Sequence, residues 1–198
     1  NYIRKLPYVK IEDLQTDGQP VVMNNYTGLR AVGLATGVEA YVIEVRAGLE
    51  SQSPNLNTLY VRYVKSSGSN KTFSSTEQIQ LRNFKTGAVI TSVTGAGTVT
   101  GESATTIGLS TALKISDGVI YQKGNFILVS SQTTIVQKYG QTPNGLVAGF
   151  NTVETLVNSN NDTSLLDNAQ GYNNENAPGA DRINLTPTLV VKTIAAAD

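Results

Sequence analysis

Two segments, AYVIEVR at residues 40–46 and TLYVRYVK at residues 58–65, decide the fold class. In both, apolar side chains recur at every second position, a period typical of a β-strand with one buried and one exposed face. The residues expected to share buried faces are Tyr41, Ile43, Val45, Leu59, Val61 and Tyr63. The sequence therefore predicts two half-buried strands joined by a loop.

Similar short segments continue along the chain, among them GVIYQ at residues 118–122 and TTIVQK at residues 133–138. They are separated by pairs such as Asp117-Gly118 and Gly124-Asn125, which are common in hairpin turns. A meander is the simplest arrangement of these strands. FILV, residues 126–129, is apolar on both faces, which indicates a central strand or one half-covered by a partner.

One short helix is expected near residues 163–170. Asp162 or Thr163 can cap its first amides, and Gly171 can adopt the left-handed conformation that ends a helix. Beyond an Asn-rich loop, a final strand carries five apolar-face positions, namely Ile183, Leu185, Pro187, Leu189 and Val191. Because proline has no N–H to donate, this strand is expected at a sheet edge or at a bulge.

These patterns predict a mainly β protein, either an antiparallel β-sandwich or two packed β modules, with one short helix. A weak boundary is expected at 105/106. It divides an N-terminal β region with an extended arm, residues 1–105, from a C-terminal β domain with the helix and the Asn-rich loop, residues 106–198. The first residue is Asn1 rather than Met, which predicts a processed chain or part of a longer one.

The composition excludes several classes of function. The chain has 15 basic and 15 acidic residues, so it lacks the positive charge on which nucleic-acid affinity depends. It contains no Cys and no His, which removes thiolate nucleophiles, imidazole bases and the common zinc ligands. No apolar run approaches 18 residues, so we expect no membrane segment. We likewise expect no cofactor and no bound metal.

Four carboxylates, Asp162, Asp167, Glu175 and Asp181, lie within twenty positions and could in principle supply an acid and a base. The alternative is that Asp162 caps the short helix, Asp167 anchors the loop, and Asp181 pairs with Arg182 or with a backbone amide. Nearby asparagines offer calcium ligands, but the turn Gly and the closing Glu of a calcium loop are missing. We therefore predict structural roles and no catalytic residues.

Four tyrosines present two further alternatives. Tyr60, Tyr121, Tyr139 and Tyr172 could stack on sugar rings, although the chain has no Trp to strengthen such a platform. Tyrosine is equally suited to subunit interfaces, where aromatic side chains contribute much of the binding energy. The interface is the favoured interpretation.

An ordered series of motifs between Gly118 and Lys192 carries a family resemblance. It comprises GVIYQKGNFILVSSQTTIV, then PNGLVAGF at residues 143–150, then DTSLLDNAQGYNNENAPGADR at residues 162–182. This series resembles a family of bacteriophage virion proteins found in tail-fibre and baseplate components, often known only as a domain of unknown function. The resemblance implies a structural part of the tail apparatus that assembles as an oligomer, often a trimer, with other tail proteins as partners.

The sequence thus predicts a virion protein, made in the host cytoplasm, that acts by oligomeric assembly and fibre attachment. A receptor- or carbohydrate-binding β domain is the first alternative, and a glycan-degrading enzyme is the second. The candidate assembly residues are Leu165, Leu166, Tyr172, Pro178, Asp181 and Arg182. Packing of the same leucines within one chain remains an equal alternative.

Overall fold

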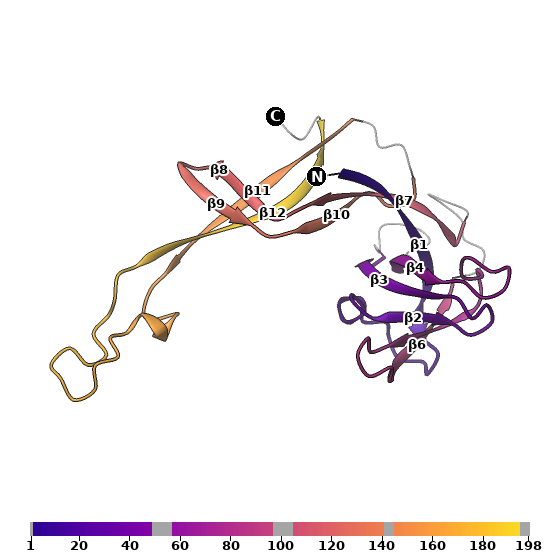
Figure 1. The fold of residues 1–198 in the computed structure, drawn as a ribbon, viewed down its shortest axis with the longest axis horizontal. Coiled ribbons are helices and arrows are strands. Elements are labelled where there is room, and N and C mark those ends of the chain that lie inside the picture. Colours follow the sequence, from indigo (N-terminus) through magenta and orange to yellow (C-terminus); the bar gives the residue numbers. More distant parts are fainter. Residues whose placement is uncertain (1, 49–56, 97–104, 141–144, 195–198) are drawn as a thin grey trace. The chain divides into compact units, whose positions relative to one another are not determined.

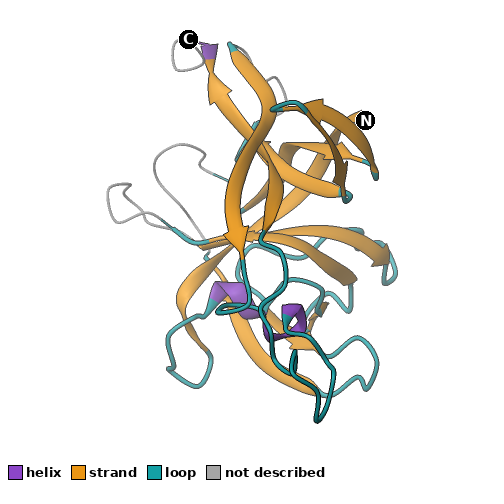
Figure 2. Ribbon diagram, turned by 90° about the vertical axis from the view of Figure 1, so that its left-hand side faces the viewer, coloured by secondary structure: helices purple, strands orange, loops and turns teal. Residues whose placement is uncertain are grey.

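The computed structural model describes residues 2–48, 57–96, 105–140 and 145–194. Within them the chain is mainly β, as the sequence predicts, and the helical turns are short (Figure 2).

The chain divides into two compact units, which are taken one at a time. The barrel unit comprises residues 3–113 and 135–143, and the ribbon unit comprises residues 1–2, 114–134 and 144–198. Apart from the change of unit after Tyr2, the chain first passes from the barrel unit to the ribbon unit after Leu113, whereas the sequence placed its weak boundary at 105/106.

Six antiparallel strands close into a barrel in the order β1-β4-β3-β2-β5-β6, and a pairing of β6 with β1 completes the ring (Figure 1). Strands β7 and β10 extend the sheet beyond β1. The bounds are β1 (Tyr2–Gln15), β2 (Arg30–Gly33), β3 (Glu39–Arg46), β4 (Asn57–Lys65), β5 (Gln78–Arg82), β6 (Val89–Gly95), β7 (Ile107–Ile115) and β10 (Gln132–Gln137), with a 3-10 turn, η1, at Met23–Asn25.

The expected sandwich is therefore wrong for this unit, because one sheet closes on itself instead of two sheets stacking. Strand β1 makes the closure possible. Its fourteen residues are long enough to pair with β4 and, further along, with β6. Closure of the barrel provides hydrogen-bond partners for backbone N–H and C=O groups that would be unpaired at an open sheet edge.

The barrel interior is the main core of the chain. Its members are buried apolar side chains from the barrel strands and their connections, namely Val9, Ile11, Met23, Tyr26, Ala31, Val38, Ala40, Val42, Val45, Leu59, Val61, Phe73, Ile79, Leu81 and Val93. Alternate residues of each strand enter this interior, which is why the period of two is visible in the sequence.

A bulge in β3 changes which of its side chains face the interior. Strand β3 advances by two residues, from Val42 to Glu44, while β4 advances by one, so Ile43 is the extra residue. Val42 and Val45 consequently both enter the barrel core. The expected grouping of Tyr41, Ile43 and Val45 on one buried face is wrong, because the bulge shifts the alternation by one position.

A second buried cluster lies on the outer wall of the barrel, where β1 and β4 are covered. Its buried members are Leu6, Tyr8, Tyr60 and Ala112, and Tyr139 packs against them. The hydroxyl oxygens of Tyr139 and Thr58 lie 2.9 Å apart. The Tyr60 hydroxyl has no hydrogen-bond partner among the described residues, and burial raises its pKa. Strand β4 is thus buried on both faces around Tyr60, more deeply than its alternation predicts.

Two buried carboxylates hold the barrel connections. Glu77 accepts hydrogen bonds from the backbone N–H groups of Ala35 (3.1 Å), Thr36 (3.0 Å) and Ser74 (2.6 Å), and from the Thr36 hydroxyl (3.0 Å). It therefore ties the turn after β2 to the loop before β5. A Cβ at Gly33 would overlap the Glu77 carboxylate, so a glycine is needed there.

The second of these carboxylates is Glu39, at the start of β3. It accepts hydrogen bonds from the Lys65 ammonium (2.9 Å) and from Arg30 Nε (2.9 Å). The hydrogen bond from Lys65, reinforced by Arg30, holds the pKa of Glu39 below its ordinary value, although burial opposes this. Glu39 thus links β2, β3 and β4 while it is ionised.

The ribbon unit is built from two pairs of strands. Strands β8 (Gly118–Gln122) and β9 (Asn125–Val129) form a hairpin, and β11 (Leu146–Val157) and β12 (Arg182–Thr193) form a long two-stranded ribbon (Figure 1). The expected meander is wrong, because β7 and β10 pair with each other and the hairpin is inserted between them in the sequence.

The helix expected near residues 163–170 is a single 3-10 turn, η2, at Thr163–Leu165. Asp162 caps it as predicted, because its carboxylate accepts a hydrogen bond from the Ser164 amide at 3.0 Å. The turn stops early because Leu166 is extended and forms an isolated bridge with Pro178. The expected extent of the helix, to residue 170, is therefore wrong.

Candidate functional site

The β11–β12 ribbon has one largely apolar face. Twelve residue pairs are in register from Leu146 opposite Thr193 to Val157 opposite Arg182. The apolar-face side chains of β12 are those that the sequence predicted. Opposite them on β11 are three apolar residues, Ala148, Phe150 and Leu156, and two polar ones, Thr152 and Glu154. A two-stranded sheet alone is marginally stable in water, so this face requires cover.

The β8–β9 hairpin supplies part of that cover through its inner face. Ile127 and Val129 are buried. The Thr152 hydroxyl donates a hydrogen bond to the Gln122 side-chain oxygen (2.6 Å), which joins the hairpin to the ribbon. The Lys123 ammonium and the Glu154 carboxylate form an ion pair at 3.2 Å.

The outer face of the same hairpin is apolar and exposed. Val119 is 62%, Tyr121 67%, Phe126 81% and Leu128 75% exposed. Val119 lies opposite Leu128 and Tyr121 opposite Phe126, so the four side chains share one face, and the rings of Tyr121 and Phe126 are 5.1 Å apart between centroids. We call these four residues the hairpin patch.

The size of the hairpin patch is unusual for one hairpin. Taking about 200 Å² for an aromatic side chain and somewhat less for an aliphatic one, the exposed portions add up to about 500–600 Å². This is at the upper end for the largest apolar patch on a typical monomer, and patches of this size mark interaction sites. Strand β9 pairs only with β8 in the described part of the chain, so the central strand expected as one alternative for residues 126–129 is wrong, and cover of its outer face by a partner stays a prediction.

Further apolar surface lies at the far end of the ribbon. Leu156 and Ile183 are directly opposite each other, and both are exposed. The described part of the chain offers no buried neighbour that would cover this pair. The ribbon unit therefore presents apolar side chains both on its hairpin and near its terminal loop.

The six candidate residues of the sequence lie in or beside the loop at residues 158–181. Leu165 is buried and Leu166 is half-buried, whereas Tyr172, Pro178, Asp181 and Arg182 are exposed. The Gly179 amide donates to the Leu165 carbonyl (2.8 Å), which closes the loop next to the bridge between Leu166 and Pro178. The structure thus brings the two leucines and the Pro178-Gly179 segment together and leaves Tyr172 apart from them.

The carboxylates of this loop bind backbone and side-chain amides of the same loop. Asp167 accepts from the Ala169 amide (2.9 Å) and the Asn174 side chain (2.7 Å), and Glu175 accepts from the Gly171 amide (2.8 Å). Hydrogen bonds from Ser164 hold the pKa of Asp162 below its ordinary value. These contacts give Asp162, Asp167 and Glu175 structural roles within the loop, and the expected pairing of Asp181 stays a prediction.

The structure does not bring the four tyrosines together as a sugar-binding platform. Tyr60 is buried and Tyr139 is half-buried in the barrel cluster, whereas Tyr121 and Tyr172 are exposed, so that alternative is wrong. Over residues 2–48, 57–96, 105–140 and 145–194, His, Cys, Asp and Glu form no group of three or more that could hold a metal ion. In the same residues, no helix has the length and apolar character needed to cross a lipid bilayer.

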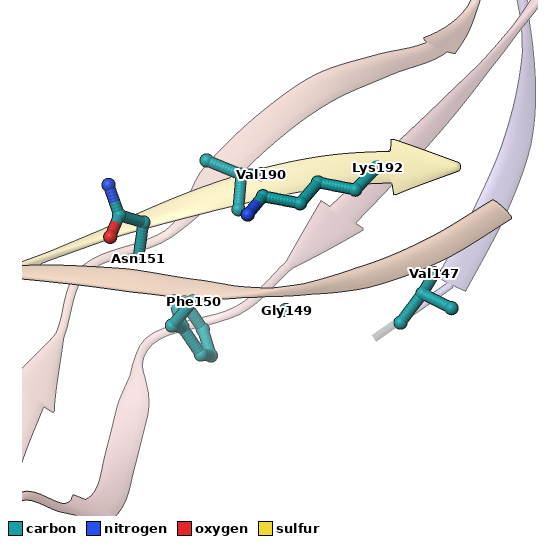
Figure 3. Close-up of a pocket in the computed structure, with 6 residues that line it drawn as sticks. All are labelled: Val147, Gly149, Phe150, Asn151, Val190 and Lys192. Atoms are coloured by element: carbon teal, nitrogen blue, oxygen red, sulfur yellow. The ribbon is translucent and has the colours of Figure 1, made fainter. Parts of the chain in front are cut away.

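A shallow pocket of about 220 Å³ lies on the ribbon itself (Figure 3). It is lined by Val147, Gly149, Phe150, Asn151, Val190 and Lys192. The absence of a side chain at Gly149 contributes to this hollow. The lining side chains are mainly apolar, with one cation, Lys192, and one amide, Asn151.

The structure thus defines a class of protein that combines a closed β-barrel with an open β-ribbon. Its most prominent candidate site is an apolar surface rather than a cleft. The chain belongs to the family described as Domain of unknown function (DUF4815), whose model matches residues 62–197. No curated protein matches the chain. No solved structure matches it either.

The hairpin patch is the feature that sequence reasoning missed as a site. The available signal was the two-faced apolar pattern of FILV at residues 126–129, together with Tyr121 on the preceding strand. The candidate residues were instead chosen from the loop at residues 158–181, where the family resemblance is densest. The assembly role of those residues remains a prediction.

Proposed function

We propose that this chain is a structural subunit of a bacteriophage virion, in the baseplate or tail-fibre region of the tail, and that it acts by assembling into homo-oligomers. The hairpin patch is the observation that carries the assembly part of the proposal. The virion part is supported by the resemblance of residues 118–192 to phage tail proteins, a segment that falls largely in the ribbon unit.

The area of the hairpin patch is sufficient for a specific contact. If one patch of about 500–600 Å² is buried against a similar surface of a second copy, the total is about 1,000–1,200 Å². Specific interfaces start at about this size. The patch carries no charged side chain, so two copies can approach without repulsion or desolvation of a charge.

Association of the purified chain tests the assembly part. We expect oligomers in sedimentation velocity at micromolar concentration, and we expect Phe126→Ser to raise the dissociation constant about 10- to 100-fold, because truncating a buried aromatic anchor commonly costs about 2 kcal/mol or more. Phe84→Ser is the matched control, since Phe84 is an exposed phenylalanine of the barrel unit. A wild-type chain that stays monomeric at tens of micromolar would contradict self-assembly.

The virion part has a separate test. Mass spectrometry of purified phage particles is expected to detect the chain at a fixed copy number, and gold labelling is expected to fall on the tail tip or the fibres. Label confined to lysate or to the capsid would contradict a tail position.

A receptor- or carbohydrate-binding domain is the second candidate. It is favoured by the exposed rings of Tyr121 and Tyr172, which could stack on sugars. A host-glycan array distinguishes the two functions. Saturable glycan binding that Tyr172→Ala abolishes, with association unchanged, would favour the receptor-binding function.

A further inference from the structure

The outer edge of β11 carries unpaired backbone groups, and their direction follows from β12. The Gln132 side chain donates to the Pro187 carbonyl (2.9 Å) and accepts from the Leu189 amide (2.8 Å), so these two groups point away from β11. Opposite residues in an antiparallel pair exchange both hydrogen bonds or neither. Thr152 and Phe150, which lie opposite them, therefore also point their N–H and C=O groups outward.

The same direction recurs at every second residue of β11, namely Leu146, Ala148, Phe150, Thr152, Glu154 and Leu156. Among the described residues, only the Leu156 carbonyl of this outward set has a partner, the Asn161 side-chain amide at 3.2 Å. Of this outward set, Ala148, Glu154 and Leu156 are exposed, Leu146 and Phe150 are half-buried, and Thr152 is buried. A long exposed strand edge of this kind is a template for pairing with another strand.

The two edges of the ribbon are not equivalent. The β12 edge is occupied at its middle by Gln132, and Pro187 has no N–H to offer a partner. Strand β11 contains no proline, and a side-chain amide caps it only at its end. A partner strand can therefore reach the exposed stretch of β11 around Ala148, but not the centre of β12.

We propose that the outer edge of β11 pairs antiparallel with β11 of a second copy of this chain, which produces a four-stranded sheet, β12-β11-β11-β12, across a two-fold axis. This deepens the proposed assembly function and rests on it. The pairing continues the apolar face of each ribbon into its partner, because antiparallel neighbours keep their side chains on matching faces.

Charge is compatible with self-pairing. Glu154 is the only charged residue of β11. A two-fold axis anywhere between Ala148 and Thr152 sets the two Glu154 side chains at least four positions apart in the paired strands. Gly149 and Asn151 lie near the centre of the strand, where a neighbouring backbone can approach closely.

Cysteine cross-linking tests the pairing, because the natural chain contains no Cys and any disulfide must join two copies. We would substitute Ala148, Gly149, Phe150, Asn151 and Thr152 singly by Cys and oxidise each full-length variant. The position nearest the axis is expected to cross-link at least fivefold more than Thr188→Cys. Thr188 lies directly opposite Asn151 and is also exposed, but on β12.

The Thr188→Cys control should not cross-link, because its two copies are too far apart in the proposed sheet. In the proposed sheet the two Thr188 residues are separated by three strand spacings, about 14 Å, beyond the roughly 7 Å that a disulfide can bridge between Cα atoms. As a second measurement, Ala148→Pro removes an outward N–H without touching the β11–β12 ladder. Each symmetric pair loses that group twice, so the dissociation constant is expected to rise about 10-fold or more.

The outcomes separate this pairing from the assembly function. If the wild-type chain associates but no β11 position exceeds Thr188→Cys, the self-pairing is refuted and assembly through the hairpin patch stands. Association that needs a second tail protein, with cross-links only to that protein, also refutes self-pairing. If the wild-type chain is monomeric, both the self-pairing of β11 and the proposed assembly function are refuted.

Discussion

Removal of the Glu77 carboxylate is expected to destabilise the barrel more than removal of any exposed carboxylate. Glu77→Ala leaves three backbone amides and one hydroxyl without their acceptor. Hydrogen bonds to charged groups contribute about 1.5–3 kcal/mol each when buried. Because Ala35 and Ser74 are exposed, water replaces the acceptor at those amides, and we take about 1 kcal/mol for each amide.

The expected loss in the free energy of unfolding is therefore about 3 kcal/mol, a large part of the 5–15 kcal/mol typical of a domain. Equilibrium urea unfolding, followed by near-UV circular dichroism of tyrosine, measures it. The chain has no Trp, and six of its nine tyrosines lie in the barrel unit. Glu12→Ala is the matched control, since Glu12 is an exposed carboxylate of β1 and should change stability by less than about 0.5 kcal/mol.

Glu77→Gln separates charge from shape, because the amide keeps the side-chain volume but offers one acceptor oxygen where the carboxylate offers two. Its loss is expected to fall between those of Glu12→Ala and Glu77→Ala. If Glu77→Ala lowers the free energy of unfolding by less than about 1 kcal/mol, the argument that this carboxylate ties two loops together is refuted.

Two further changes probe the barrel by the same unfolding measurement. Tyr60→Phe is expected to leave the free energy of unfolding unchanged or to raise it by up to about 1 kcal/mol, because the Tyr60 hydroxyl is buried without a partner among the described residues. Tyr8→Phe should lower it, because the substitution removes a 3.1 Å hydrogen bond to Thr105. An equal loss of stability in both variants would contradict this reasoning. The stabilisation from ionised Glu39 is present above its ordinary pKa of 4.5 and is lost as the pH falls through its lower folded pKa, so Glu39→Gln should flatten the decline in stability at acid pH. An unchanged acid profile in this variant would show that another carboxylate is responsible.

The β class of the fold could be predicted because alternation is a local signal. The buried Leu59 and Val61 and the apolar face of β12 follow directly from a period of two. Ring closure could not be predicted, because it depends on which strand edges meet, and nothing local in β6 indicates that Val93 lies opposite Gln15. The bulge at Ile43 was also hidden, since a single inserted residue looks like ordinary alternation until the partner strand is known.

The loop at residues 158–181 shows the same limit at shorter range. The cap at Asp162 was predicted correctly because capping depends on residues close in sequence. The length of the helix was wrong, because the bridge from Leu166 to Pro178 and the hydrogen bond from Gly179 to Leu165 compete with helix continuation. For the candidate site, the exposure of Phe126 and Leu128 could not be predicted because it depends on which face of the β8–β9 hairpin is covered in the fold.

The connection of β11 and β12 at one end through a loop has a mechanical consequence. Twelve residues at about 3.4 Å each make the ribbon about 40 Å long. A pull on the terminal loop loads both strands in the same direction, so tension runs along the two covalent backbones and does not unzip the rungs between them. The ribbon should therefore resist stretching from its tip, yet separate readily if its two open ends are drawn apart.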